Sequence, residues 1–217
     1  MILFDCSVLC LTLYPRAGIP NDFRTDKPIE FAKERIDGLI ADSEQTGEII
    51  LIPTPALSEV LVVVAPDIQE YLDELSSQAC FKVVPFGERA AIEVALRTKA
   101  AIKKGDKREG VASAWDKVKY DRQIVAIAKV EGASAIYSTD RHIHAHAAAW
   151  GIKVLNVSDL PIPAKQGSLY GEQTAETVAA DPVSSEIRGS DLGRAEGQAG
   201  AEVPEEEGNN QETGKAE

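Results

Sequence analysis

The alternation of short apolar runs with longer segments of helical periodicity is the feature that most constrains the fold. The runs have the length of buried strands, and the segments between them repeat apolar residues at helical spacing. We expect strands at residues 2–4, 49–52, 81–84, 135–137 and 152–155. Parallel strands need a long crossover between them, which is usually a helix. The sequence therefore predicts an α/β fold in which helices pack on a parallel sheet.

Local signals predict where the helices begin and end. The first helix is expected to be capped near Ser7, and Pro28 to open a second helix that ends at Gly47. Another helix is expected to begin at Asp121 and to end before Gly132. The remaining helices are expected after Thr54-Pro55, over residues 68–76 and 88–102, and from Asp140 to Trp150.

The last quarter of the chain differs in composition from the rest. Residues 165–217 carry twelve acidic and four basic side chains, so they hold most of the formal charge of -12. They contain one aromatic residue, Tyr170, and few large aliphatic ones. Such a segment buries too little apolar surface to offset the entropy cost of ordering. We expect one domain over residues 1–160 and a disordered acidic tail over residues 161–217.

Nothing in the sequence predicts insertion into a membrane. No run approaches the roughly 20 apolar residues of a membrane span, and the N-terminus lacks the pattern of a secretory signal. The three cysteines, Cys6, Cys10 and Cys80, lie in apolar segments without a CxxC pair, which favours buried, reduced thiols. We therefore expect a soluble, cytoplasmic protein with no membrane partner.

Four carboxylates stand at positions that suit a common site. Asp5 and Asp140 follow expected strands, and ligand sites in open α/β sheets lie at the carboxyl ends of strands. Glu59 and Asp121 each share a helix face with apolar residues, Glu59 with Val62 and Val63 among them. We expect both helical carboxylates to face the sheet rather than the water.

Several carboxylates gathered in one place repel each other and need a cation. Oxygen ligands without histidine or cysteine suit Mg²⁺ or Mn²⁺. The alternative interpretation is that Asp121 and Asp140 are helix caps or partners of a helix dipole, as acids near helix starts commonly are. Four acids in this arrangement favour the metal site.

Three segments resemble the motif regions of PIN-domain nucleases, in the same order and at similar spacing. They read LFDCSVLCLTL, PTPALSEVLVVV and YDRQIVAIAKVEGASAIYSTDRH. The resemblance covers about residues 1–157 and implies a three-layer α/β/α sandwich around a parallel sheet. It also implies that Asp5, Glu59, Asp121 and Asp140 are the four acids of the nuclease site.

Further roles follow from the same resemblance. Ser7 and Thr139 match polar positions that steady the metal or its waters. Many members carry another acid two residues after the fourth one, where this sequence has His142. The number of metals therefore stays open. The implied activity is metal-dependent hydrolysis of RNA, with Asp5, Asp121 and Asp140 holding metal and Glu59 holding metal or the attacking water.

RNA is the implied substrate, and basic residues near Asp121 are candidates to contact it. Residues 97–122 carry nine basic and four acidic side chains in an otherwise acidic protein, although a solvated helix face and loop would explain them equally well. The candidates for RNA contact are Lys117, Lys119, Arg122, Arg141 and His142. By analogy with toxins of toxin–antitoxin pairs, we also expect a homodimer and an antitoxin protein.

Two other functions stay open at this stage. A phosphatase could use Asp5 as nucleophile. The sequence pattern of haloacid-type phosphatases, however, requires a second Asp at position 7, where this chain has Ser7. The alternative that is not an enzyme is a catalytically silent domain that binds RNA or a protein. The presence of all four acids argues against it.

Overall fold

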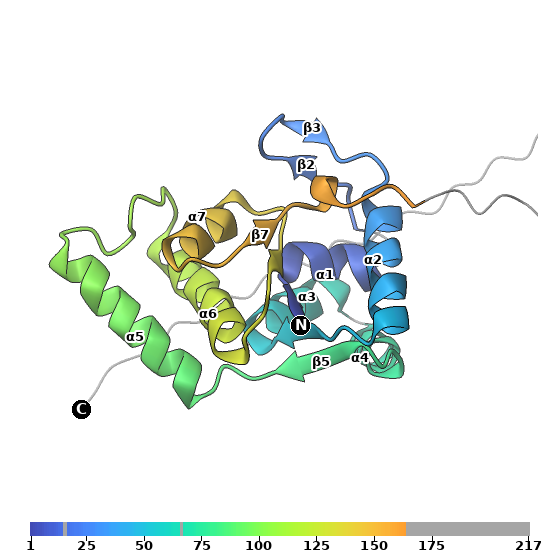
Figure 1. Ribbon diagram of the computed structural model, residues 1–217, viewed down its shortest axis with the longest axis horizontal. Helices are drawn as coiled ribbons and strands as arrows, with labels where there is room; N and C mark the ends of the chain where they lie inside the picture. The colour runs from blue at the N-terminus through green and yellow to red at the C-terminus, as the bar shows by residue number, and fades with distance from the viewer. Residues whose placement is uncertain (15–16, 66, 164–217) are drawn as a thin grey trace, which may run out of the picture. The chain divides into compact units, whose positions relative to one another are not determined.

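The computed structural model describes residues 1–14, 17–65 and 67–163. The expected disordered tail lies almost wholly outside these residues, and the division of the chain at residue 160 stays a prediction. Figure 1 shows the arrangement of the helices and strands in the described part.

A five-stranded parallel sheet lies at the centre of the fold, in the order β5-β4-β1-β6-β7. Its strands are β1 (Ile2–Phe4), β4 (Ile50–Pro53), β5 (Phe81–Val84), β6 (Ile136–Tyr137) and β7 (Val154–Leu155). Every residue of β1 and β4 is buried, which explains why these strands appear as uninterrupted apolar runs. The parallel sheet predicted from the sequence is confirmed.

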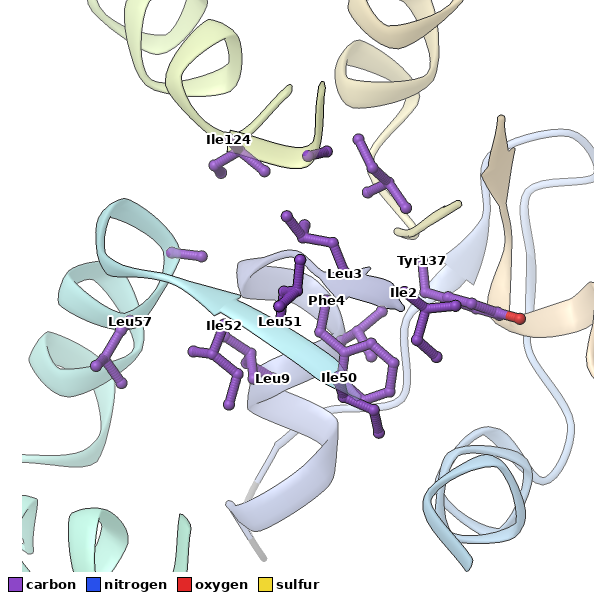
Figure 2. Close-up of a cluster of buried hydrophobic side chains, with 14 of the residues drawn as sticks. Ile2, Leu3, Phe4, Leu9, Ile50, Leu51, Ile52, Leu57, Ile124 and Tyr137 are labelled. Atoms are coloured by element: carbon purple, nitrogen blue, oxygen red, sulfur yellow. The ribbon is translucent and has the colours of Figure 1, made fainter. Parts of the chain in front are cut away.

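Helices cover both faces of this sheet. From β1 the chain steps outward to β4 and β5, and then crosses back to β6 and β7 on the other side of β1. Because crossovers between parallel strands are right-handed, this reversal places the later helices on the opposite face. Figure 2 shows the result, with Leu9 on one side of the strands and Ile124 on the other.

The first layer of helices comprises α1 (Cys6–Leu13), α2 (Ala32–Thr46), α3 (Thr54–Val64) and α4 (Ile68–Ser77). The second comprises α5 (Glu88–Lys103), α6 (Trp115–Glu131) and α7 (Arg141–Ala149), and the 3-10 helix η1 (Val157–Asp159) follows β7. This is the expected three-layer α/β/α sandwich.

Three helix starts differ from the sequence prediction. Asp5, not Ser7, caps α1, because its carboxylate accepts a hydrogen bond from the amide of Val8. Pro28 does not open a helix; it belongs to strand β3 (Lys27–Pro28), and α2 begins only at Ala32. Helix α6 begins at Trp115, six residues before Asp121, because charged residues with weak apolar periodicity form its first part.

The two helix ends assigned to glycines are confirmed. Gly47 follows α2 with a φ of 73°, and Gly132 follows α6 with a φ of 72°. Glycine adopts this left-handed conformation without steric cost, which makes it a common helix terminator. In the described part of the chain, no helix is long and apolar enough to cross a membrane.

A small antiparallel hairpin lies outside the main sheet, formed by β2 (Asn21–Asp22) and β3. The buried carboxylate of Asp22 accepts hydrogen bonds from Arg24 and from the hydroxyl of Ser158 in η1. Phe23 packs edge-to-face on the ring of His144 in α7, with 4.7 Å between the ring centroids. The hairpin is thereby tied both to η1 and to the helix that follows β6.

Candidate active site

The candidate site lies at the carboxyl ends of the neighbouring strands β1 and β6. Phe4 pairs with Tyr137, so the residues that follow them, Asp5 and Ser138, emerge side by side. The amide of Asp5 donates a hydrogen bond to the carbonyl of Tyr137 at 3.2 Å. The strand register therefore brings Asp5 close to the segment that carries Asp140, although 135 residues separate them in the sequence.

Two hydroxyl groups hold the carboxylate of Asp5. Ser7 Oγ donates to Oδ1 at 2.7 Å, and Ser138 Oγ donates to Oδ2. The amide of Val8 also donates to Oδ1, at 3.1 Å. The side chain is only 3% exposed. Its burial raises the pKa of Asp5 to about 6, although the hydrogen bonds from Ser138, Ser7 and Val8 act in the opposite direction.

The hydroxyls of Ser7 and Ser138 also fix the loop after β6. The amide of Thr139 donates to Ser7 Oγ at 3.0 Å, and the amide of Asp140 donates to Ser138 Oγ at 2.9 Å. Thr139 thus takes part through its backbone, and the hydroxyl that reaches Asp5 is that of Ser138. The sequence analysis did not single out Ser138. The feature that could have identified it is a small hydroxyl residue directly at the end of a buried strand.

Asp140 caps helix α7 and faces a lysine from α6. Its Oδ1 accepts a hydrogen bond from the amide of His142 at 2.7 Å, and its Oδ2 lies 2.6 Å from Lys117 Nζ. Burial opposes ionisation, but the hydrogen bonds from Lys117 and the His142 amide outweigh it and lower the pKa of Asp140. The capping role that the sequence left open for Asp140 is therefore real, and it coexists with a place in the site.

Asp121 is buried on α6 with few polar neighbours. It is 3% exposed, and its Oδ2 has no hydrogen-bond partner among the described residues. Lys117 Nζ lies 3.5 Å from Oδ1, and His146 Nε2 lies 3.9 Å from Oδ2. Burial raises the pKa of Asp121 to about 7; Lys117 opposes this shift, whereas the charges of Asp140 and Glu59 add to it.

Glu59 lies within electrostatic range of these groups but is exposed. The buried residues of α3 are Pro55, Ala56, Leu57, Val60 and Val64. The prediction that Glu59 shares a buried face with Val62 and Val63 is therefore wrong, since all three are exposed. Helix α3 is apolar on nearly every side, so its sequence did not determine which face would meet the sheet.

These side chains fit a divalent cation electrostatically. Asp5 and Asp121 carry buried carboxylates that are hard to ionise, and one oxygen of Asp121 has no hydrogen-bond partner in the described part of the chain. A cation bound beside them would favour their ionised forms. Within residues 1–163, as far as they are described, no three acidic, histidine or cysteine side chains already form a metal-binding group. Lys117 supplies positive charge there instead.

The five candidates for RNA contact occupy different environments. Arg141 is exposed, and His142 is half-buried with Nδ1 3.3 Å from Asp140 Oδ1. Lys119 is exposed and pairs with Asp116 at 2.6 Å. Lys117 binds the carboxylates described above.

Arg122 requires a correction, because its side chain is completely buried. Its Nη2 lies 2.9 Å from Glu109 Oε2, and its Nη1 donates to Thr98 Oγ1 at 3.0 Å. The guanidinium also lies over the ring of Trp115. Arg122 therefore holds the loop between α5 and α6 and does not reach solvent.

No family model and no curated protein match the sequence. Among solved structures, a chain of VapBC2 from Rickettsia felis, bound to a DNA fragment from their promoter, has a TM-score of 0.48 at 11% identity, over 72% of this chain and 98% of that chain. A chain of FitAB bound to an IR36 DNA fragment has a TM-score of 0.47 at 19% identity, over 74% and 98%. A chain of DNA-bound VapBC from Salmonella typhimurium has a TM-score of 0.47 at 14% identity, over 72% and 97%. At these identities the similarity concerns the fold alone.

A cavity of about 540 Å³ lies away from the acids, beside α2. Its lining includes Arg35, Leu39, Tyr137 and residues 160–163, and none of the four predicted acids. This cavity is therefore separate from the candidate site.

Proposed function

We propose that this chain is a metal-dependent endoribonuclease that hydrolyses RNA phosphodiester bonds with Asp5, Glu59, Asp121 and Asp140. The observation that carries the proposal is that two buried carboxylates with raised pKa, Asp5 and Asp121, each lie within electrostatic range of Asp140. Buried groups that are hard to ionise are characteristic of functional sites. Their positions agree with the motif regions that resemble PIN-domain nucleases.

Asp5, Asp121 and Asp140 would hold Mg²⁺ or Mn²⁺ in this proposal. The bound metal would supply Lewis acidity toward the phosphodiester and stabilise developing charge. Ser7 and Ser138 keep the Asp5 carboxylate in a fixed orientation, and the start of α7 does the same for Asp140. Glu59 is exposed on α3 and would orient the attacking water or complete the metal ligands.

The phosphatase alternative is disfavoured by the environment of Asp5. A nucleophilic carboxylate needs an accessible oxygen, whereas Oδ1 accepts two hydrogen bonds and Oδ2 accepts one. The side chain is also almost fully buried. Asp5 is therefore poorly exposed for attack on a phosphate ester, whereas Oδ2, which accepts a single hydrogen bond, keeps a lone pair for a metal ion.

The experiment that tests the proposal measures cleavage of labelled structured and unstructured RNA in Mg²⁺, Mn²⁺ or EDTA. Wild type is compared with Asp5→Asn and Asp121→Asn, and with Asp116→Asn as a matched control. Asp116 lies on the same helix as Asp121, but it is exposed and pairs with Lys119. We expect metal-dependent cleavage that falls by at least about 100-fold in the two site variants and is unchanged in the control.

The outcomes separate the nuclease from a silent binding domain. Cleavage that persists in EDTA, or in both site variants, would contradict the metal mechanism. RNA binding without cleavage or metal binding would favour the silent domain. In that case Lys117 would serve as the permanent counter-charge of Asp121 and Asp140.

The analogy with toxins also leads us to propose an antitoxin partner. Its test is whether the neighbouring reading frame encodes a small protein that copurifies with this chain and inhibits its cleavage of RNA. A solitary gene without a copurifying partner would contradict the analogy and leave the nuclease proposal intact.

A further inference from the structure

The ammonium group of Lys117 contacts two of the carboxylates that we assign to the metal. Nζ lies 2.6 Å from Asp140 Oδ2 and 3.5 Å from Asp121 Oδ1. Asp140 and Asp121 come from different elements, the cap of α7 and the body of α6. Lys117 is four residues before Asp121 on α6, so the two side chains lie on the same face of the helix.

This contact uses oxygens that a divalent cation would also need. A metal held by Asp121 and Asp140 would lie within a few ångströms of the lysine nitrogen. Two cations at such a separation repel each other strongly in a partly buried site. The ammonium and the metal therefore compete for the same carboxylate oxygens.

We propose that Lys117 is a tethered counter-cation that neutralises Asp121 and Asp140 in the metal-free protein and must leave them when the metal binds. The inference rests on the proposed function, because it takes these two carboxylates as metal ligands. It assigns Lys117 to control of metal loading, which differs from the direct RNA contact expected from the sequence.

The side chain of Lys117 is suited to such an exchange. It is 43% exposed, so its flexible stem can turn toward solvent without disturbing the core. Ion pairs of partly exposed lysines add little net stability, and a divalent cation can displace them readily. By contrast, the buried guanidinium of Arg122 is fixed by several partners and cannot exchange in this way.

The first test measures Mn²⁺ binding by calorimetry to wild type, Lys117→Met and Lys119→Met. Lys119 is the matched control, because it is two residues away but pairs with the exposed Asp116. Both variants lose one positive charge, and only Lys117→Met removes the competitor. We expect Lys117→Met to bind Mn²⁺ about tenfold more tightly than wild type, the size expected from one charge-assisted hydrogen bond, and Lys119→Met to bind as wild type does.

A second measurement follows Lys117 itself. Wild type is treated briefly with an amine-acylating reagent, with and without Mn²⁺, and modification at each lysine is quantified by mass spectrometry. We expect Mn²⁺ to raise acylation of Lys117 severalfold and to leave Lys119 unchanged. Denaturant unfolding of each variant in EDTA establishes that Lys117→Met is folded. Lys117→Arg keeps a positive charge beside the two carboxylates, so we expect it to bind Mn²⁺ as weakly as wild type does.

The outcomes distinguish this inference from the proposed function. Equal or weaker Mn²⁺ binding by folded Lys117→Met, or acylation of Lys117 that does not respond to Mn²⁺, would overturn the counter-cation role and leave the nuclease standing. Failure of every variant to bind Mn²⁺ or Mg²⁺ would overturn the metal site, and the inference with it.

Discussion

The serine hydroxyls around Asp5 show how single side chains position the site. Ser138 Oγ donates to the Asp5 carboxylate and accepts from the amide of Asp140, so one atom joins two of the four acids. Ser7 makes an equivalent bridge from Asp5 to Thr139. Because Ser138 and Asp5 are buried, bulk water cannot replace the Ser138 hydroxyl without reorganising the loop.

Replacing Ser138 with alanine should destabilise the fold. Ser138→Ala leaves one oxygen of the buried Asp5 and the amide of Asp140 without their partner, so we expect a loss of about 1–3 kcal/mol in the free energy of unfolding. Denaturant unfolding measures it. Ser77→Ala is the control, since that exposed hydroxyl only bonds within α4 and its loss should cost less than about 0.5 kcal/mol. Equal effects of the two substitutions would contradict the bridging role.

The raised pKa of Asp5 predicts a pH dependence of stability in the absence of metal. Burial shifts the pKa from 3.8 to about 6, so between these values the folded state binds more protons than the unfolded state. The stabilising contribution of the protonated form is full below pH 3.8 and is lost as the pH rises toward 6 and above. At about 1.36 kcal/mol per unit, the shift corresponds to roughly 3 kcal/mol.

Asp5→Asn tests this shift because the amide cannot ionise. In EDTA, its stability relative to wild type should increase as the pH rises from 4 to 7, as measured by denaturant midpoints. Asp116→Asn, at an exposed position, should show no such increase. A constant difference between Asp5→Asn and wild type across this range would contradict the raised pKa.

At the scale of elements, ion pairs between Glu109 and two arginines hold α6 and the loop before it together. Glu109 in the loop accepts from Arg97 on α5 and from Arg122 on α6. Arg122 also donates to the carbonyl of Lys107, and Lys107 lies over the ring of Trp115. Figure 1 shows α5 and α6 connected by this loop. The network holds the start of α6, where Lys117 and Asp121 are placed.

This arrangement predicts opposite effects for two arginines that the sequence treated alike. Arg122→Met should destabilise the protein by about 3 kcal/mol, because it removes one partner of a buried ionic network. Arg141→Met, at an exposed position, should change stability by less than about 0.5 kcal/mol. In a protein that also carries Asp5→Asn, so that RNA is bound but not cleaved, Arg141→Met should instead lower the RNA affinity, because we propose that Arg141 contacts phosphate. Thermal unfolding and fluorescence anisotropy measure the two effects, and reversed effects would contradict the assignment.

At the scale of the whole molecule, the described domain leaves a set of apolar side chains uncovered. On α5, Ile92 is 50% and Leu96 is 59% exposed. They are four residues apart and therefore lie on the same face of the helix. Exposed apolar surface of this kind commonly marks an interface.

We expect this face of α5 to support self-association. Leu96→Glu should shift the protein toward monomer in sedimentation velocity experiments, because it places a charge in the interface. Ile19→Glu is the control, since Ile19 is 67% exposed elsewhere in the domain. A wild type that stays monomeric at all concentrations, or equal effects of both substitutions, would contradict the prediction.

The sequence by itself determined the order of helices and strands, and with it the parallel sheet. The buried apolar runs of β1 and β4, the glycines after α2 and α6, and the acids after β1 and before α7 all act through neighbours close in the chain. Such local signals can be identified without knowledge of the fold. They were sufficient to place Asp5 and Asp140 at one edge of the sheet.

The tertiary structure alone decided which side chains face each other there. Helix α3 is apolar nearly all round, so only packing against its neighbours determined that Val60 is buried and Glu59 is exposed. The roles of Ser138 and Lys117 likewise depend on partners far away in the sequence or on another element. Sequence periodicity records how apolar a helix face is, but contacts between distant segments set the partners of a polar group.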